Sequence, residues 1–354
     1  MKKILSIPVI FIIFTAALLL TWRCSDDNPV TTPPPEPPYE YDSARFDWKV
    51  DTLYGQGFYY GLWAADTNEI FIPNIFTNVL VHIKNGIKTY SYYTKERPVG
   101  AIFGDELNKG YRAGAILIDS LYQPLIQKWD GNSFVDISNP LNLDRNFFYW
   151  TGFIKNSTEM WFGLTDGNLI KFDGSTFTVY PLYDSRIKSL KFFYDESNKF
   201  KLLASIHHLD IDQTEFLIYE FTGSQWVKVF NDKESPRPLR YVVLNKYVSA
   251  NNRITIFELI DSLLAPKINI VPNATQFSMD GFSFDNILVP GQGVIGDCYT
   301  TLFHWNGSKW SVELCGYWVD PLTDVFMINE NYYYAITHDP REITFVMRGI
   351  KKFH

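Results

Sequence analysis

The sequence has no excess of basic charge. It carries 32 Lys and Arg residues against 39 Asp and Glu, which gives a formal net charge of -7 at pH 7. A protein that binds nucleic acid needs a basic stripe or patch against the phosphates, and this chain shows none. The composition therefore argues against a nucleic-acid partner. With 354 residues, 46% of them hydrophobic, the chain is long enough for one large domain or two small ones.

Motifs that mark common enzyme sites are also scarce. No Gly-x-Ser-x-Gly nucleophile elbow occurs, and FDGSTF at 172–177 only echoes the Asp-box Ser-x-Asp-x-Gly-x-Thr-Trp. GQGVIG at 291–296 fits Gly-x-Gly-x-x-Gly, but a dinucleotide site needs a following helix and a strand-like segment follows here, so we expect a loop. His207 and His208 are neighbours, and neighbouring side chains of a strand point to opposite faces. The sequence predicts no cofactor and no metal site.

A helical period is missing from the whole chain after residue 44, and a repeat takes its place. The shared pattern is an apolar stretch, Phe or Trp, then Asp, Asn or Thr before Gly, two small or polar residues, and again Phe or Trp. It occurs around Gly131, Gly174, Gly223 and Gly307, with looser copies at Gly86 and Gly349 and a degenerate copy at Ser262. The steps average about 44 residues, which predicts seven units.

Each repeated glycine marks an expected β-hairpin. Asp-Gly and Asn-Gly supply the positive φ values of a tight two-residue turn, and the flanking residues alternate as strands do. A period in the forties with four short strands per unit is typical of a β-propeller. The sequence therefore predicts an all-β fold, a seven-bladed β-propeller, with six blades as the alternative. Aromatic residues, 17% of the chain, would recur because blades stack face to face.

The N-terminus has the layout of an export signal. Two lysines precede an apolar run, Ile4 to Leu20, which is marginal in length for a spanning helix. Cys24 and the acidic Ser-Asp-Asp after it resemble a bacterial lipoprotein signal, and specifically the surface-export signals of Bacteroidetes-type lipoproteins, although Trp22-Arg23 stands where small residues are usual. The resemblance implies lipid attachment at Cys24. An uncleaved anchor and an incidental thiol are the alternatives.

Three segments follow from this layout: a signal peptide at 1–23, a tether at 24–43 and the propeller at 44–354. TTPPPEPP within the tether favours an extended, semi-rigid polyproline stalk. We expect an extracytoplasmic protein, lipid-anchored at the outer membrane or cell surface, in either leaflet.

The segment MWFGLTDGNLIKFDGSTFTVYP, 160–181, resembles the repeat of the two-component-regulator propellers. That resemblance covers one unit well and the other units mainly over their last hairpin. It implies an extracytoplasmic propeller that binds or relays, since propellers of that family mostly do so and some are linked to glycan sensing.

Two predictions concern pairing. RFDWKVDTLYG, 45–55, could add the outer strand of the last blade and so remove an exposed edge, or it could simply lead into the first blade. If Asn306-Gly307 is a two-residue turn, Cys298 lies opposite Cys315 in a non-hydrogen-bonded pair, with Cα atoms roughly 4.5 Å apart. That spacing allows a disulfide. Two free thiols are the alternative, and a four-residue turn would shift the register.

The expected ligand face lies where the outer strand of one blade connects to the inner strand of the next, beside the central channel. Aromatic rings there could stack on sugars, and arginines could grip carboxylates. The candidates are Tyr60, Arg97, Tyr149, Trp150, Arg186, Arg240 and Trp318. Such a ring would suit an acidic glycan or the acidic loop of a partner protein. The alternative is that these side chains plug the channel and pack blade against blade.

The sequence thus favours a non-enzymatic binding platform for a glycan or protein, tethered to a membrane through its N-terminal lipid. The alternative is a carbohydrate hydrolase or lyase, whose carboxylates would come from different blades at the channel mouth and so show no recognisable spacing. A structural part of an envelope complex is a third possibility. The oligomeric state stays open.

Overall fold

The computed structural model describes residues 44–352, apart from short gaps at 55–60, 75–76, 96–99, 106–108, 142–148, 165–166, 182–186, 195–199, 208–215, 223–224, 233–241, 245–246, 251–252, 261–262, 273–274, 277–278, 284, 296–297, 317–321 and 340–342. The chain divides into two compact units, Met1–Glu40 and Tyr41–His354, and everything described belongs to the second. No helix among these residues is long and apolar enough to cross a membrane.

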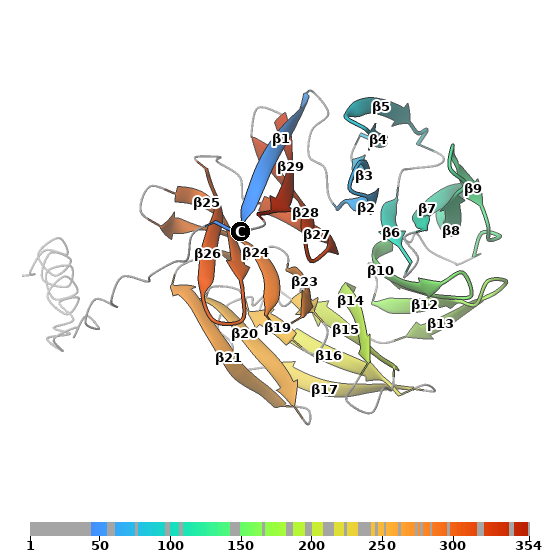
Figure 1. Cartoon of the computed structure of the whole chain (residues 1–354). Helices are drawn as coiled ribbons and strands as arrows, with labels where there is room; N and C mark the ends of the chain where they lie inside the picture. The colour runs from blue at the N-terminus through green and yellow to red at the C-terminus, as the bar shows by residue number, and fades with distance from the viewer. Residues whose placement is uncertain are drawn as a thin grey trace, which may run out of the picture. The chain divides into compact units, whose positions relative to one another are not determined.

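The described residues contain β-strands and no helix, and the strands pair into seven antiparallel sheets (Figure 1). The first sheet contains β2 (Trp63–Asp66), β3 (Glu69–Asn74), β4 (Val79–Lys84) and β5 (Ile87–Tyr92). The second contains β6 (Ala101–Gly104), β7 (Gly110–Ile118), β8 (Leu121–Trp129) and β9 (Phe134–Asp136). The third contains β10 (Tyr149–Asn156), β11 (Glu159–Leu164), β12 (Asn168–Phe172) and β13 (Phe177–Pro181).

The remaining sheets repeat the same plan. The fourth contains β14 (Ile187–Tyr194), β15 (Phe200–His207), β16 (Phe216–Phe221) and β17 (Trp226–Asp232). The fifth contains β18 (Val242–Leu244), β19 (Tyr247–Ala250), β20 (Arg253–Ile260) and β21 (Leu263–Pro272). The sixth contains β22 (Thr275–Gln276), β24 (Asn286–Ile295), β25 (Cys298–Trp305) and β26 (Trp310–Gly316), with β23 (Asp280–Ser283) also paired to β24. The seventh contains β27 (Leu322–Asn329), β28 (Tyr332–Asp339), β29 (Ile343–Lys351) and β1 (Phe46–Tyr54).

Contacts between sheets run along the chain and return to their start. β2 contacts β6, β6 contacts β10, β10 contacts β14, β14 contacts β18, β20 contacts β22, β23 contacts β27, and β27 contacts β2. Most of these contacts join the first strands of successive sheets, so the first strands lie innermost. This propeller-like arrangement of six four-stranded sheets and one five-stranded sheet, all antiparallel, confirms the predicted all-β class.

The N-terminal strand closes the arrangement. β1 pairs with β29 along its whole length, from Phe46 opposite Lys351 to Tyr54 opposite Ile343. A segment from the start of the chain is therefore the fourth strand of the sheet made by its end, as the closure prediction required, and the lead-in alternative is wrong. The pairing covers the edge that β29 would otherwise expose.

Among the described residues, the predicted turn positions agree with the observed ones in all but one case. The turns at Gly86, Gly131, Gly174 and Gly307 all connect the third and fourth strands of a sheet. Gly223 and Ser262 lie outside the described residues, in the gaps between β16 and β17 and between β20 and β21. Gly349 is the exception, because it lies within β29, opposite Trp48 of β1 and Tyr333 of β28. Here the fourth strand comes from the other end of the chain, so no hairpin is needed.

The expected two-residue turn is correct at Asn85-Gly86 and wrong at three other turns. Lys84 pairs with Ile87, and both Asn85 and Gly86 have positive φ, 52° and 78°. The turns after Trp129, Phe172 and Trp305 have four residues instead. In each of them only the glycine has a positive φ, between 92° and 104°. The reason lies in the first turn residue, Asp130, Asp173 or Asn306, whose Oδ1 accepts the backbone N–H groups two and three residues later.

This turn changes the cysteine register. Trp305 pairs with Trp310, and an irregularity follows at Leu302, so Cys315 lies opposite Thr301 and not opposite Cys298. The predicted direct pairing of the two cysteines is therefore wrong. Cys315 is nevertheless disulfide-bonded. Cys298 begins β25 and Cys315 lies near the end of β26, so both belong to the open end of one hairpin.

The aromatic repeat packs sheet against sheet, as expected. Across the third and fourth strands the rings form pairs with centroids 4.9 to 5.2 Å apart: Trp129 with Phe134, Phe172 with Phe177, Phe221 with Trp226, and Trp305 with Trp310. The pairs reach the preceding sheet, where Trp129 lies 4.9 Å from Phe71 and Phe221 lies 4.8 Å from Trp161. These two pairs, Trp129 with Phe134 and Phe221 with Trp226, are thus wedges between neighbouring sheets, which gives a reason for the recurring pattern in the sequence.

Candidate functional site

The predicted ligand face falls almost wholly outside the described residues. Tyr60, Arg97, Arg186, Arg240 and Trp318 lie in the gaps, as does the expected lipid-attachment residue Cys24. Tyr149 and Trp150 begin β10, and only their backbone is described. The predicted loop at 291–296 is wrong in part, because Gly291 to Ile295 continue β24.

A polar pocket lies instead at the side of the second sheet, next to the third. Its volume is about 380 Å³. Its lining includes Ile116, Leu125, Asp136, Ser138, Asn139 and Ser175. Ile116 and Leu125 come from β7 and β8, the next three residues from the end of β9 and the chain after it, and Ser175 from the turn between β12 and β13. Two neighbouring sheets therefore build one pocket.

Two buried side chains, linked by hydrogen bonds, hold the Asp136 carboxylate in the pocket wall. Gln127, buried at 4% exposure, donates from Nε2 to Oδ1 of Asp136 at 2.6 Å. Its Oε1 accepts hydrogen bonds from Nε and Nη2 of Arg112, which is buried at 3% exposure. The Arg112 guanidinium also lies 4.0 Å from the ring centroid of Tyr93, a cation–π contact. Each partner fixes the next, so Asp136 has one preferred orientation at the pocket wall.

Backbone bonds fix the rest of the wall. The N–H of Ile126 donates to Oγ of Ser138 at 2.9 Å, and the N–H of Ile137 donates to the carbonyl of Ile126 at 3.0 Å. On the third sheet, Oγ of Ser175 donates to Oδ1 of Asp173 at 2.8 Å. Hydrogen bonds from the backbone N–H groups of Thr176 and then Ser175 hold the pKa of Asp173 well below its usual range, so this carboxylate is charged at neutral pH.

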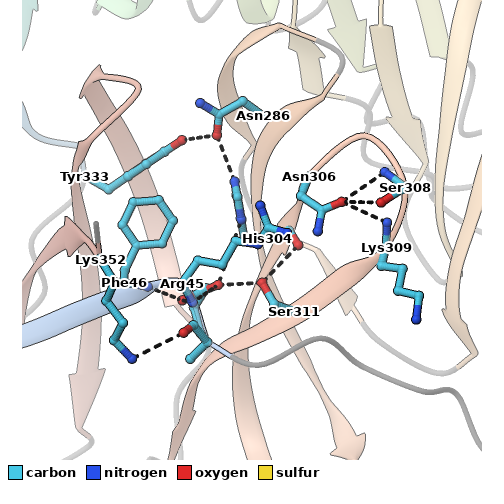
Figure 2. A network of polar contacts seen from close by, with 12 residues as sticks. Arg45, Phe46, Asn286, His304, Asn306, Ser308, Lys309, Ser311, Tyr333 and Lys352 are labelled. Atoms are coloured by element: carbon cyan, nitrogen blue, oxygen red, sulfur yellow. Dashed lines mark hydrogen bonds and ion pairs between the residues drawn. The ribbon is translucent and has the colours of Figure 1, made fainter. Parts of the chain in front are cut away.

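A second polar network joins the sixth and seventh sheets where β1 begins (Figure 2). The carboxylate of Glu313 accepts the backbone N–H of Arg45, at 3.0 and 2.9 Å, and that of Phe46 at 3.0 Å. It also accepts a bond from the hydroxyl of Ser311. The backbone carbonyl of Arg45 accepts the N–H of Lys352 at 2.7 Å, so both edges of this stretch are bonded.

His304 lies inside this network as a neutral imidazole. Oδ1 of Asn286 accepts the Tyr333 hydroxyl and Nε2 of His304, which places the imidazole proton on Nε2 (Figure 2). Burial, followed by the charges of Arg45 and Lys351, lowers the pKa of His304 to about 3. Its Nδ1 lies 3.9 Å from Glu313 Oε1, but without a charge on the ring this contact is no ion pair at neutral pH. Burial also raises the pKa of Tyr333. The network is structural: it binds β1 to the two sheets.

Carboxylates on or beside the described inner strands serve the backbone. Asp105, after β6, accepts the N–H of Lys109 at 2.8 Å and the hydroxyl of Tyr111 at 3.3 Å. Asp280 of β23 accepts the N–H of Met327 at 2.6 Å. Among the described residues no group of three His, Cys, Asp or Glu has a metal-binding arrangement. These contacts give no specific support to the hydrolase alternative.

Sequence reasoning did not find the pocket. Ser175 belongs to the repeated turn, and Asp136 directly follows a short strand, but such polar residues at strand ends are the ordinary composition of a propeller. Only the packing of the second sheet against the third brings them together. No signal in the sequence would have separated them from other turn residues.

No protein-family model and no curated protein matches this chain. Solved structures match it in fold. YCF48 bound to a D1 peptide has a TM-score of 0.62 at 10% identity, with 89% of this chain and 99% of that one covered. BBS1N in complex with ARL6DN has a TM-score of 0.56 at 11% identity, with 88% and 98% covered. The extracellular domain of a one-component system of B. thetaiotaomicron, BT4673, has a TM-score of 0.53 at 13% identity, with 87% of this chain but 42% of that one covered.

Proposed function

We propose that this protein is an extracytoplasmic binding platform: a seven-bladed propeller, tethered to a membrane through Cys24, that recognises a glycan or a protein partner. The observation that carries the proposal is the fold itself, closed sheets that leave loops and side pockets as the variable surface. Rigid scaffolds of this kind commonly carry binding residues on their connections.

The similar structures support a binding role. One neighbour is described with a bound peptide and another in complex with a partner protein. Their identity to this chain is 10% and 11%, so they argue for the kind of task the fold performs and not for the partner. The seven sheets of the described residues, closed by β1, support the blade count of seven.

The tether is proposed from the N-terminal signal. The fold neighbour from a bacterial one-component system is an extracellular domain, which is consistent with a site of action outside the cytoplasm. We expect Cys24→Ala to move the protein from the detergent phase to the aqueous phase after Triton X-114 extraction, because the lipid would be lost. Cys298→Ser is the matched control and should stay in the detergent phase. Equal partitioning of Cys24→Ala and the wild type would contradict lipidation.

The ligand class is tested with the full chain in detergent, screened on a glycan array and by cross-linking to envelope proteins, with turnover assayed for any glycan bound. Binding without turnover is expected. Hydrolysis or elimination of a bound glycan would replace the platform by the hydrolase or lyase alternative. Loss of binding in Trp150→Ala at unchanged melting temperature would place the ligand at the predicted channel mouth.

A further inference from the structure

The side pocket combines a polar and an apolar lining. We propose that the pocket between the second and third sheets binds a sugar residue that carries no acidic group, as a second recognition site away from the channel mouth. This inference rests on the binding-platform function proposed above, and it names a ligand class for one site of that platform.

The polar lining offers both partners that a sugar hydroxyl needs. Each hydroxyl donates one hydrogen bond and accepts others. The Asp136 carboxylate accepts, and the Asn139 amide both donates and accepts. The Ser138 oxygen already accepts the N–H of Ile126, which leaves its own proton to donate, while the Ser175 hydroxyl donates to Asp173 and keeps lone pairs to accept.

The apolar part of the lining can contact the C–H face of a pyranose ring. Ile116 is half-buried and offers most of this apolar surface, since Leu125, which also lines the pocket, is only 3% exposed. A volume of about 380 Å³ lies near the lower end of the range for small-molecule pockets, which spans roughly 300–1,000 Å³. The pocket is therefore of a size for one or two sugar residues and not for a long segment of protein.

The charge of the pocket selects among sugars. Asp136 lies in its wall, and Asp173 lies directly behind Ser175. Both side chains are carboxylates, and the lowered pKa of Asp173 keeps that one charged. Arg112 is buried, donates to Gln127 and lies over the ring of Tyr93. A uronic or sialic acid carboxylate would meet two like charges, so the pocket disfavours the acidic glycan that the predicted arginine face would suit.

The wall is organised before any ligand arrives. Asp136 is held through Gln127 by Arg112, and Ser138 by the backbone of β8. A ligand therefore pays little side-chain ordering on binding, which favours affinity from few contacts.

The test applies the full chain, in detergent, to one glycan array that carries two sets of probes. The first set contains oligosaccharides ending in glucose, galactose or mannose, and the second contains matched oligosaccharides ending in glucuronic acid. We expect binding to at least one neutral probe and weaker binding to its acidic counterpart. Asp136→Asn keeps the shape and removes the charge. It should raise the Kd for the neutral probe about tenfold, since charge-assisted hydrogen bonds are lost, and narrow the gap between neutral and acidic probes.

Ser175→Ala is the second variant, because it lies in an exposed turn and should leave the fold intact; it should weaken the same probe. Asp119→Asn is the matched control, an exposed aspartate of the β7–β8 turn with φ of 48°, a conformation that asparagine accepts. It should bind as the wild type does. Neutral-probe binding that neither pocket variant alters, or preference for the acidic probe, would overturn the pocket and leave the platform standing. Absence of any glycan binding with capture of a protein partner would also overturn it, and absence of every ligand would overturn the platform as well.

Discussion

Oε2 of Glu313 accepts the backbone N–H of Phe46 at 3.0 Å, across 267 positions of sequence. Phe46 is the first residue of β1, and its ring lies edge-on to His304 and Tyr333, with centroids 5.2 and 4.8 Å away. The sixth sheet thus holds the strand that completes the seventh. The proposed tether, 24–43, directly precedes β1 in the sequence. The strand that closes the propeller would therefore also connect the propeller to its membrane tether.

Replacing Glu313 should loosen this closure. Glu313→Gln keeps the shape but weakens charge-assisted hydrogen bonds to two backbone N–H groups, and we expect the free energy of unfolding to fall by about 1–3 kcal/mol. Urea denaturation measures the loss, and amide exchange should rise first along β1. Glu330→Gln, an exposed glutamate of the β27–β28 turn, is the control. Equal free energies of unfolding for the two variants would show that the Glu313 hydrogen bonds to the start of β1 do not stabilise the fold.

Acid should weaken the same network through His304. Its pKa is about 3 in the fold, against about 6.5 in the unfolded chain, so the unfolded state binds the proton more readily. The contribution of neutral His304 to the free energy of unfolding is complete above about pH 6.5. It is lost as the pH falls toward 3, by up to roughly 1.4 kcal/mol per pH unit. Urea unfolding between pH 6.5 and 5 should show this slope in the wild type and a shallower one in His304→Gln. Parallel slopes would mean that another group controls the acid response.

Gly349 should tolerate no side chain while Trp48 is present. A Cβ at Gly349 would lie 2.7 Å from Cη2 of Trp48, on the strand pair that closes the propeller. We expect Gly349→Ala to cost about 1–3 kcal/mol, measured by urea unfolding. In Trp48→Ala the same glycine substitution should cost much less, because the indole is gone. Additive losses in the double variant would show that the close approach is not the cause.

The residues that the wedge pairs contact should contribute more to stability than residues of the outer surface. Trp161 is fully buried, with its ring 4.8 Å from that of Phe221 and 5.8 Å from that of Trp226 in the next sheet. Trp161→Ala should cost about 3–5 kcal/mol. Val227→Ala, on the same outer strand as Trp226 but 39% exposed, should change stability by a small fraction of that. Similar losses in both would argue against wedge packing between the sheets.

We propose Cys298 as the disulfide partner of Cys315. If Cys24 carries a lipid, Cys298 is the one remaining cysteine of the chain. Cys298→Ser should leave one free thiol under denaturing, non-reducing conditions and lower stability by about 3 kcal/mol, as for a closed loop of roughly 15 residues. A disulfide that survives in Cys298→Ser would assign the partner to Cys24 and remove the lipid.

The sequence by itself determined the features that depend on near neighbours. Asp173 and Ser175 are two residues apart, and the hydrogen bonds between them need no partner from elsewhere in the chain. The turn therefore recurs visibly, and its spacing predicts the four-stranded unit. The hydrogen bonds to the first turn residue that lengthen the turn are also local, within four residues. The preference of Asp-Gly and Asn-Gly for two-residue turns does not take these bonds into account. The register predicted for Cys315 is therefore wrong.

Only the tertiary structure decided which distant residues meet. Nothing near Glu313 announces Arg45 or Phe46, and nothing near Asp136 announces Ser175, because these contacts arise when separate sheets pack together. Strand alternation constrains which face a side chain takes, but not which sheet it will face. The contact of Glu313 with the start of β1 and the side pocket both depend on how the sheets pack together, and that packing involves residues along the entire chain.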